Sequence, residues 1–374
     1  MRVAILLPVI FLAFLFITPF SFAQSEATPR ITSRISEVMV LRRKQVDDMQ
    51  RRAEAGEAEA QFVVGAIYRQ GGLLGPKNDT EAFRWFRKAA DQNFIKAEIA
   101  LGDAYAFGSG VPQSYEQAVL WYTKAAQKGD PVAANDLGVL YHLGLGVTRS
   151  NSRAIEWFGQ AAGKGLAAAQ FALGYMYQTG QGLNRDLRRA AKLHLAAAQQ
   201  GFARAQNELG VMYVRGEGVR KDAGEGFRWF LVAAQGGDTS AQNNLGYLYI
   251  TGQGVTRDFA EGSRWLKASA EKGDPFAQVS LGDLYANARG VPLDYVEAYK
   301  WFSLAALQNI DEAVGARRSI EKVMTKRQVS DAKIRIALWE EQHSRLAEKR
   351  PEEFDSVEPR DSSKDWLSCC AVSQ

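Results

Sequence analysis

The chain has 374 residues and a nearly balanced charge, with 46 basic and 42 acidic side chains and a net charge of +4. Because 46% of its residues are hydrophobic and 24% are charged, the composition is that of a folded protein and excludes a wholly disordered one. The small, dispersed positive charge also argues against nucleic acid as a partner.

Residues 1–23 are predicted to be a secretory signal peptide. A single charge at Arg2 precedes a long apolar stretch, and Ser21-Phe22-Ala23 offers small residues before a cleavage point at Gln24. The alternative is an uncleaved anchor, because Val3–Phe22 has about the length that spans a bilayer. We expect cleavage, a periplasmic or secreted protein, and no stable membrane span in the mature chain.

Residues 24–55 are expected to cap the N-terminal end of the folded region. Arg34–Ala55 has a helical pattern and ends in RRAEAG, which is similar to the KAAQKG that ends at Gly129. This segment is therefore predicted to be the second helix of an incomplete leading unit, with a charged outer face.

A 36-residue period runs from residue 56 to residue 309. Tryptophan recurs at intervals of 36 or 72 residues, at Trp85, Trp121, Trp157, Trp229, Trp265 and Trp301. The pair Leu-Gly follows the same period from Leu101-Gly102 to Leu281-Gly282, and Val64-Gly65 is a weaker first copy. The sequence therefore predicts seven repeated units.

Each unit is predicted to contain two helices. The first carries Ala-Gln-x-x-Leu-Gly-x-x-Tyr, as at Ala205–Tyr213, with its small and apolar residues on one face. Glycine costs a helix about 1 kcal/mol relative to alanine, so the glycine of Leu-Gly is expected to let a neighbouring helix approach closely. The second helix carries Ala-x-x-Trp-Phe/Tyr-x-x-Ala-Ala, as at Ala118–Ala126, and its tryptophan, such as Trp157, is expected to be a large buried knob.

A Gly-x-Gly turn follows the first helix in five units and resembles a phosphate-binding loop. A dinucleotide site would need a preceding strand and a third glycine at the start of a helix, and the sequence has neither. We therefore predict that the first glycine, as at Gly216, ends the first helix in a left-handed conformation. The residues expected to cap the second helices are Ser114, Asp186, Asp222 and Asp258.

Residues 310–346 are expected to form C-terminal capping helices. Thr325–Trp339 is predicted to be the last of them, and it carries apolar residues that would cover the final repeat, namely Val329, Ala332, Ile336 and Trp339. Residues 347–374 are predicted to be a disordered tail because Glu, Pro, Asp and Ser dominate them.

The only two cysteines, Cys369 and Cys370, are neighbours in this tail, so they cannot cross-link the body of the protein. The alternatives are a redox or metal-binding pair and a bystander. The absence of nearby histidine or further cysteine favours the bystander.

The repeat motifs resemble those of the Sel-one-like repeat (SLR) family, which is related to the tetratricopeptide repeats. The resemblance covers Gly56–Asn309 and rests on Ala-x-x-x-Leu-Gly-x-x-Tyr, Gly-x-Gly-Val and Ala-x-x-Trp-Tyr/Phe-x-x-Ala-Ala at 36-residue spacing. It implies an all-α fold, a right-handed α-solenoid of helix-turn-helix repeats, that serves as an adaptor for protein complexes. Some exported members carry a cysteine pair in each repeat, and claims of penicillin binding attach to them. This chain has no cysteine in any repeat, so that chemistry is not carried over.

No catalytic or metal site is expected. The three histidines, His142, His194 and His343, lack the spacing of metal ligands. The sequence shows no nucleophile elbow and no Ser-x-x-Lys acylation motif. A solvated helical face is expected to explain the acids of the first helices, which include Asp103, Asp136, Glu208 and Asp283. We therefore expect no cofactor and no enzymatic activity.

Binding is expected on the concave surface of the solenoid, which the resemblance assigns mainly to the first helices. Relative to the leucine of Leu-Gly, the positions five and two before it, two after it, and five or six after it should point inward. The predicted ligand-binding residues at these positions are Asn135, Asn207, Asn243, Tyr175, Tyr247, Val211, His142, Arg204 and Arg215. The three asparagines share one position and are predicted to hydrogen-bond the backbone of an extended peptide. The alternative is that asparagine is merely tolerated on a wet helical face.

Two functions follow from these features. The leading one is an exported, non-enzymatic scaffold that binds a protein or peptide partner in its groove. The alternative is a hydrolase of cell-wall material or a β-lactam-binding enzyme, which only the exported subgroup suggests. The missing cysteine pairs, nucleophile motif and metal cluster favour the scaffold.

Overall fold

The computed structural model describes residues 43–349. The predicted signal peptide, the start of the N-terminal capping region and the cysteine-bearing tail lie outside this range. Within it the regular elements are helices, and the only strand-like pairing there is an isolated bridge between Gly72 and Gly75. The predicted all-α repeat architecture is confirmed.

Each of the seven units contributes two helices to the array. The first helices are α2 (Ala58–Gln70), α4 (Ile95–Phe107), α6 (Pro131–Leu143), α8 (Ala167–Thr179), α10 (Ala203–Arg215), α12 (Thr239–Thr251) and α14 (Pro275–Ala286). The second helices are α3 (Asp79–Asp91), α5 (Tyr115–Gln127), α7 (Asn151–Gly163), α9 (Leu187–Gln199), α11 (Ala223–Gln235), α13 (Phe259–Ala270) and α15 (Tyr295–Leu307). The array is followed by α16 (Asp311–Glu321) and α17 (Lys326–Lys349).

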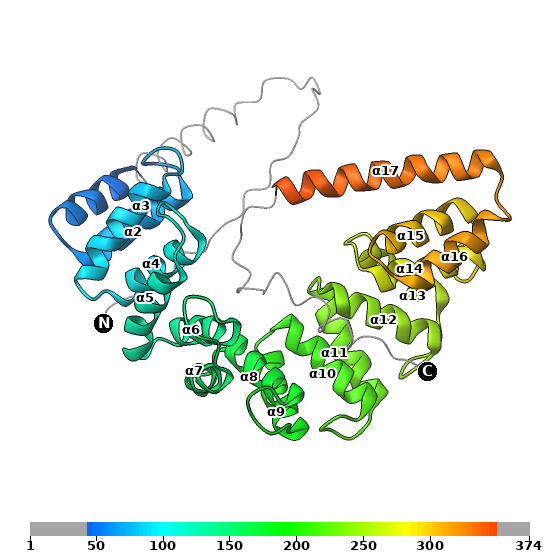
Figure 1. The fold of residues 1–374 in the computed structure, drawn as a ribbon, viewed down its shortest axis with the longest axis horizontal. Coiled ribbons are helices and arrows are strands. Elements are labelled where there is room, and N and C mark those ends of the chain that lie inside the picture. The colour runs from blue at the N-terminus through cyan, green and yellow to red at the C-terminus, as the bar shows by residue number, and fades with distance from the viewer. Residues whose placement is uncertain (1–42, 350–374) are drawn as a thin grey trace, which may run out of the picture.

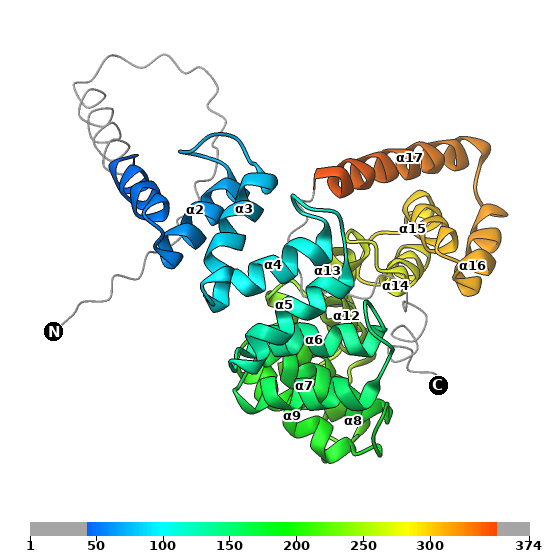
Figure 2. The same cartoon turned by 60° about the vertical axis from the view of Figure 1, so that its left-hand side comes forward.

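The units stack into an open arc (Figure 1). First helices such as α4, α6 and α8 lie on the inner side of the arc, and the second helices α5, α7 and α9 lie on the outer side. The turned view in Figure 2 shows the two ends of the array well apart, with α6–α9 between and below them. Over the second to fourth units, the inner face of the arc is therefore built mainly from first helices.

The glycine of each Leu-Gly pair allows close contact between the two helices of a unit. A Cβ atom added at Gly138 would lie only 2.7 Å from the ring of Phe158. Equivalent contacts pair Gly65 with Phe86, Gly102 with Tyr122, Gly174 with His194, Gly210 with Phe230 and Gly282 with Phe302. The expected close approach is confirmed. The expected burial of the repeat tryptophan is right for Trp121 and Trp301 and wrong for Trp157. Trp157 is half-buried, and the fully buried ring belongs to the next residue, Phe158.

The two glycines of the turn have different tasks. Gly216 ends α10 in the left-handed conformation, with a φ of 76°, as predicted. Gly218 also has a positive φ, and a Cβ atom there would overlap the backbone carbonyl of Leu187 in the preceding unit. The second glycine therefore lets the turn pack against the start of the previous second helix. The predicted caps are confirmed, because the side chains of Ser114, Asp186, Asp222 and Asp258 all accept backbone N–H bonds.

Side-chain hydrogen bonds to backbone carbonyls join one unit to the next. Gln206 in the Ala-Gln motif donates through Nε2 to the carbonyl oxygen of Ala198 at 3.1 Å, at the end of α9. The residue after a second helix reaches further back, since Lys164 Nζ donates to the carbonyl of Gly129 at 2.7 Å. Lys272 Nζ makes the same bond to Gly237 at 2.7 Å. These bonds satisfy carbonyls at helix ends and set the spacing between units.

Helices cover both ends of the array. Residues 43–54 are helical, and Gln61 Nε2 donates to the carbonyl of Ala53 at 3.1 Å, as Gln206 does to Ala198. At the other end α17 packs against α15, where Ala332 is fully buried. α17 continues to Lys349, beyond the expected end at Trp339, and in Figure 1 it runs back over the open side of the arc. None of the helices in the described range combines the length and apolarity needed to cross a bilayer.

Candidate functional site

The three asparagines predicted to form a ladder differ in their exposure. Asn135 is 6% exposed and Asn207 is 4% exposed, whereas Asn243 is half-buried. Asn135 Nδ2 donates to Asp136 Oδ1 at 3.1 Å, and Asn207 Oδ1 accepts from Asn244 Nδ2 at 2.9 Å. The structure thus corrects the expected exposure of two of the three. Their amides already have partners within the protein, and a role in binding stays a prediction.

Val211 and Tyr247 come together between the fifth and sixth units. Val211 is buried in a cluster with Phe230 and Leu245, and Tyr247 packs half-buried against the same cluster. Val211 is therefore a core residue, and the expectation that it is exposed for binding was wrong. Tyr247 keeps part of its side chain accessible. Tyr175, at the position equivalent to Tyr247 two units earlier, is also half-buried.

The charged candidates lie in three different settings. Arg204 is exposed at the start of α10, and Arg215, at the end of the same helix, lies 3.9 Å from the carboxylate of Glu217. His142 is half-buried in α6, with Nδ1 3.0 Å from Asn151 Oδ1. Burial lowers the pKa of His142, so its neutral form is favoured near neutral pH. The structure spreads these candidates along the array and does not gather them into one pocket.

Two acids of consecutive first helices form a buried polar cluster that the sequence analysis assigned to a solvated face. Tyr122 donates its hydroxyl hydrogen to Asp103 Oδ1 at 2.8 Å. Asp136 is buried, and its Oδ2 has no hydrogen-bond partner in the described residues. Burial, together with the negative charge of Asp103, raises the pKa of Asp136 to about 7. The expectation of a solvated Asp136 was wrong because the residue faces the packing between units.

A second polar chain links the fourth and fifth units. His194 is buried in α9, and its Nε2 lies 3.1 Å from Gln178 Oε1. Gln178 Nε2 in turn donates to Glu208 Oε2 at 3.4 Å. Burial lowers the pKa of His194 to about 4 and raises the pKa of Glu208. His194 is thus a neutral packing residue against Gly174, in agreement with the expected structural role.

The described residues contain no group of three or more His, Cys, Asp or Glu side chains that could hold a metal ion. Two apolar side chains at the positions predicted to point inward are exposed. Phe107 lies six residues after Leu101 and Val132 lies five before Leu137, and each is 43% exposed. Neither residue was among the predicted binding residues, although the register that selected the others includes both positions.

Stacked two-helix units with a 36-residue period define an α-solenoid repeat protein. The family model of the Sel1 repeat matches seven segments, at residues 58–94, 95–130, 131–166, 167–202, 203–238, 239–274 and 275–310. The chain belongs to the Sel1 repeat family, which confirms the resemblance inferred from the motifs. Repeats of this family typically serve as protein-interaction scaffolds.

Solved structures of repeat proteins resemble this chain. A Sel1 repeat protein from Oxalobacter formigenes is 30% identical, with a TM-score of 0.61, over 74% of this chain and 80% of its own. A protective antigen of uropathogenic Escherichia coli with an SLR fold is 25% identical over 84% of this chain and 98% of its own, with a TM-score of 0.35. A comparison with curated proteins finds no match.

Proposed function

We propose that this chain is an exported scaffold that binds a peptide or protein segment along the inner face of its arc. The observation that carries the proposal is the inner face itself, where the first helices α4, α6 and α8 of successive units follow one another along the arc (Figure 1). Such an arrangement presents equivalent positions at regular intervals, which suits an extended ligand. Export is inferred from residues 1–23.

The side chains that remain accessible for binding are aromatic, apolar and basic, whereas two of the three predicted asparagines are buried. Tyr175 and Tyr247 are half-buried, Phe107 and Val132 are partly exposed, and Arg204 is exposed. Aromatic and arginine side chains are common anchors in protein interfaces. We therefore assign the main contacts to these residues and a smaller part to Asn243.

Site-specific photo-crosslinking tests where the partner binds. A photoreactive amino acid is placed at Tyr247 on an inner helix, and in a separate variant at Leu120, which is 55% exposed on an outer helix. A partner that crosslinks at position 247 but not at position 120 supports the proposal. Crosslinking only at the outer position would contradict it.

The binding contribution of the rings is measured with the recovered partner. The double variant Tyr175→Ala/Tyr247→Ala should bind at least about tenfold more weakly, since each anchor contributes about 1 kcal/mol or more. The matched outer variant Leu120→Ala/Val232→Ala should bind like the wild type. Fractionation and mass spectrometry of the same preparation should find the N-terminus at Gln24 in exported material.

Sel1-repeat folds are generally non-catalytic scaffolds. We extend this to the present chain and expect no hydrolysis of the chromogenic β-lactam nitrocefin. Turnover by the purified protein would favour the enzyme alternative.

A further inference from the structure

A cleft of about 460 Å³ lies between the capping helix α17 and the last units of the array. Ligand pockets in proteins have volumes of roughly 300–1,000 Å³, so the cleft is large enough for a small ligand or the end of a peptide. It is lined by Glu271 at the end of α13, by Lys300 and Trp301 of α15, and by five residues of α17, which are Arg335, Leu338, Trp339, Gln342 and His343.

Two indole N–H groups of the cleft residues are enclosed without an acceptor. Trp301 is 1% exposed, and its Nε1 has no hydrogen-bond partner within the described range. The same holds for Nε1 of Trp339. An indole nitrogen can only donate, and a buried donor without an acceptor costs about 1–3 kcal/mol. Both nitrogens are closed off from solvent, so a ligand in the cleft would lie against the tryptophan side chains and not against their N–H groups.

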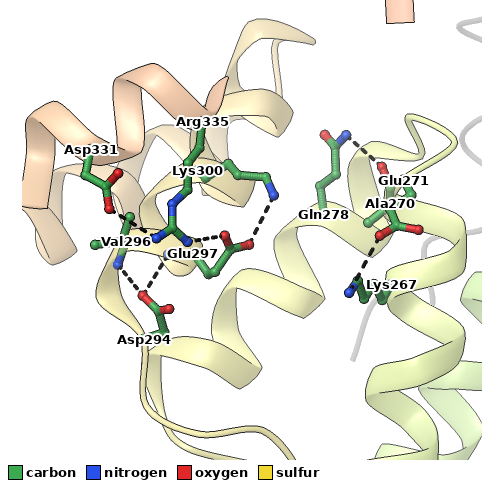
Figure 3. A network of polar contacts seen from close by, with 10 residues as sticks. All are labelled: Lys267, Ala270, Glu271, Gln278, Asp294, Val296, Glu297, Lys300, Asp331 and Arg335. Atoms are coloured by element: carbon green, nitrogen blue, oxygen red, sulfur yellow. Dashed lines mark hydrogen bonds and ion pairs between the residues drawn. The ribbon is translucent and has the colours of Figure 1, made fainter. Parts of the chain in front are cut away.

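Two cations stand on one wall of the cleft (Figure 3). Lys300 Nζ donates to Glu297 Oε2 at 3.1 Å, and Arg335 Nη1 donates to the other oxygen, Oε1, at 2.6 Å. Arg335 also donates to Asp331 through Nη2 at 3.1 Å. The Lys300 side chain is only 14% exposed, and its ammonium lies 4.0 Å from the centroid of the Trp301 ring. The bond to Glu297 uses one of its three N–H donors, so Lys300 can also receive a second anion.

The opposite wall is anionic and apolar. Glu271 lies there, and its carboxylate is 3.8 Å from Lys267 (Figure 3). The imidazole of His343 stacks on Trp339 with ring centroids 3.5 Å apart, and its Nε2 approaches the carbonyl of Glu271. Leu338 is 59% exposed beside this stack. The wall thus offers one acceptor carboxylate and a flat apolar surface.

We propose that this cleft binds the C-terminal end of a peptide whose last residue has a large apolar side chain. The terminal carboxylate accepts from Lys300, and the side chain packs against Trp339 and Leu338. The amide N–H of the last residue donates to Glu271 on the facing wall. The remaining donors of Lys300, the carboxylate of Glu271 and the apolar surface of Trp339 and Leu338 match the three parts of such a ligand.

The cleft is separate from the inner-face residues Tyr175 and Tyr247, which lie on α8 and α12. Binding in the cleft therefore does not depend on the proposed groove function. The double variant Tyr175→Ala/Tyr247→Ala should leave it unchanged, so failure of either proposal can be recognised independently.

The test uses N-acetylphenylalanine, which carries the carboxylate, the amide N–H and the apolar ring, and compares it with N-acetylphenylalanine amide. The ¹⁵N-labelled chain is titrated with each compound, and the indole N–H signals are assigned with the Trp301→Phe and Trp339→Phe variants. We expect both signals to shift with the acid and to stay in place with the amide. Lys300→Met should weaken binding of the acid about tenfold, the effect of losing one charge-assisted hydrogen bond.

Lys333→Met is the matched control, because Lys333 is exposed on α17 and does not line the cleft. Melting curves establish that Lys300→Met remains folded before its affinity is interpreted. Equal shifts with acid and amide, no shift at millimolar acid, or unchanged affinity in Lys300→Met would each overturn the proposal.

Discussion

The ammonium of Lys128 lies 2.6 Å from the carboxylate of Glu98, which is 1% exposed, and the pair joins the end of α5 to the start of α4 within the second unit. Three other units place a pair of glutamines at the same positions, Gln92–Gln61 at 2.9 Å, Gln200–Gln170 at 2.8 Å and Gln308–Gln278 at 3.1 Å. The ion pair therefore replaces an amide–amide hydrogen bond. The contact between the two helices of the second unit thus depends on charge at this position, whereas the same contact in those three units does not.

Removing one partner of this ion pair should destabilise the array. Lys128→Met leaves the buried Glu98 carboxylate without its cation, and we expect a loss of about 3 kcal/mol in the free energy of unfolding. The double variant Glu98→Gln/Lys128→Gln recreates the glutamine pair of the three other units and should return to within about 1 kcal/mol of wild type. Urea denaturation measures both, and a double variant as unstable as Lys128→Met would refute the equivalence of the two pairs.

The ring against the Leu-Gly glycine should contribute more to stability than the neighbouring tryptophan. Phe158→Ala removes a fully buried ring packed on Gly138, and we expect it to cost about 3–5 kcal/mol. Trp157→Ala removes a half-buried side chain and should cost about half as much. Thermal melts of the two variants decide the order. A larger loss for Trp157→Ala would restore the tryptophan as the main packing residue.

Stability should depend on pH through Asp136. Its pKa is about 7 in the folded protein, against about 3.9 for an unfolded aspartate. The folded state therefore holds a proton that the unfolded state has lost, so this group's contribution to stability declines as pH rises through about 4 to 7. Asp136→Asn cannot ionise, and at about pH 8 it should be more stable than wild type by roughly 2–4 kcal/mol.

The difference between Asp136→Asn and wild type should vanish below about pH 4, where both side chains are neutral. Asp283→Asn is the matched control, because Asp283 is also on a first helix but its side chain is 53% exposed. Denaturation at several pH values gives the profile. Parallel profiles for wild type and Asp136→Asn would show that Asp136 ionises freely in the folded state.

The two glycines of one turn should differ in their tolerance of a methyl group. Gly216→Ala introduces an alanine at a positive φ and should cost about 1 kcal/mol. Gly218→Ala has the same strain and also collides with the Leu187 backbone, so we expect about 3 kcal/mol. Calorimetry measures stability, and partner affinity should be unchanged in any variant that remains folded. Lost affinity in folded Gly216→Ala would make the turn a ligand site.

Much of the fold could be predicted from the sequence because the units repeat. The Leu-Gly contact, the left-handed turn glycines and the helix caps each depend on local geometry that a 36-residue period displays several times. The exchange of Trp157 for Phe158 as the buried ring was missed, although Phe158 lies on the same helical face as Ala154, four residues before it, and Ala161, three after it. The hydrogen bonds between units were also missed. A glutamine or lysine recurs just before the residue with positive φ that follows a second helix, as at Gln92 and Lys128, and this repeated position was an available signal.

The candidate site was less accessible to sequence reasoning. Register placed Tyr175 and Tyr247 at equivalent positions, but it could not show that Asn207 would turn to Asn244 in the next unit. The burial of Asp136 results from its position between two units, which a single-unit pattern does not contain. The cleft beside α17 joins α13, α15 and a helix outside the repeats, so periodicity could not reveal it.

The contact between His343 and the carbonyl of Glu271 spans 72 residues, about twice the separation of the Lys164–Gly129 bond. This contact joins α17 to the sixth unit, and α17 also packs on α15 of the seventh unit. The interactions described above for the N-terminal units join only neighbouring units. The two ends of the protein should consequently fray in different ways. A protease would trim the N-terminal end in steps of one unit and release the C-terminal end as a single block.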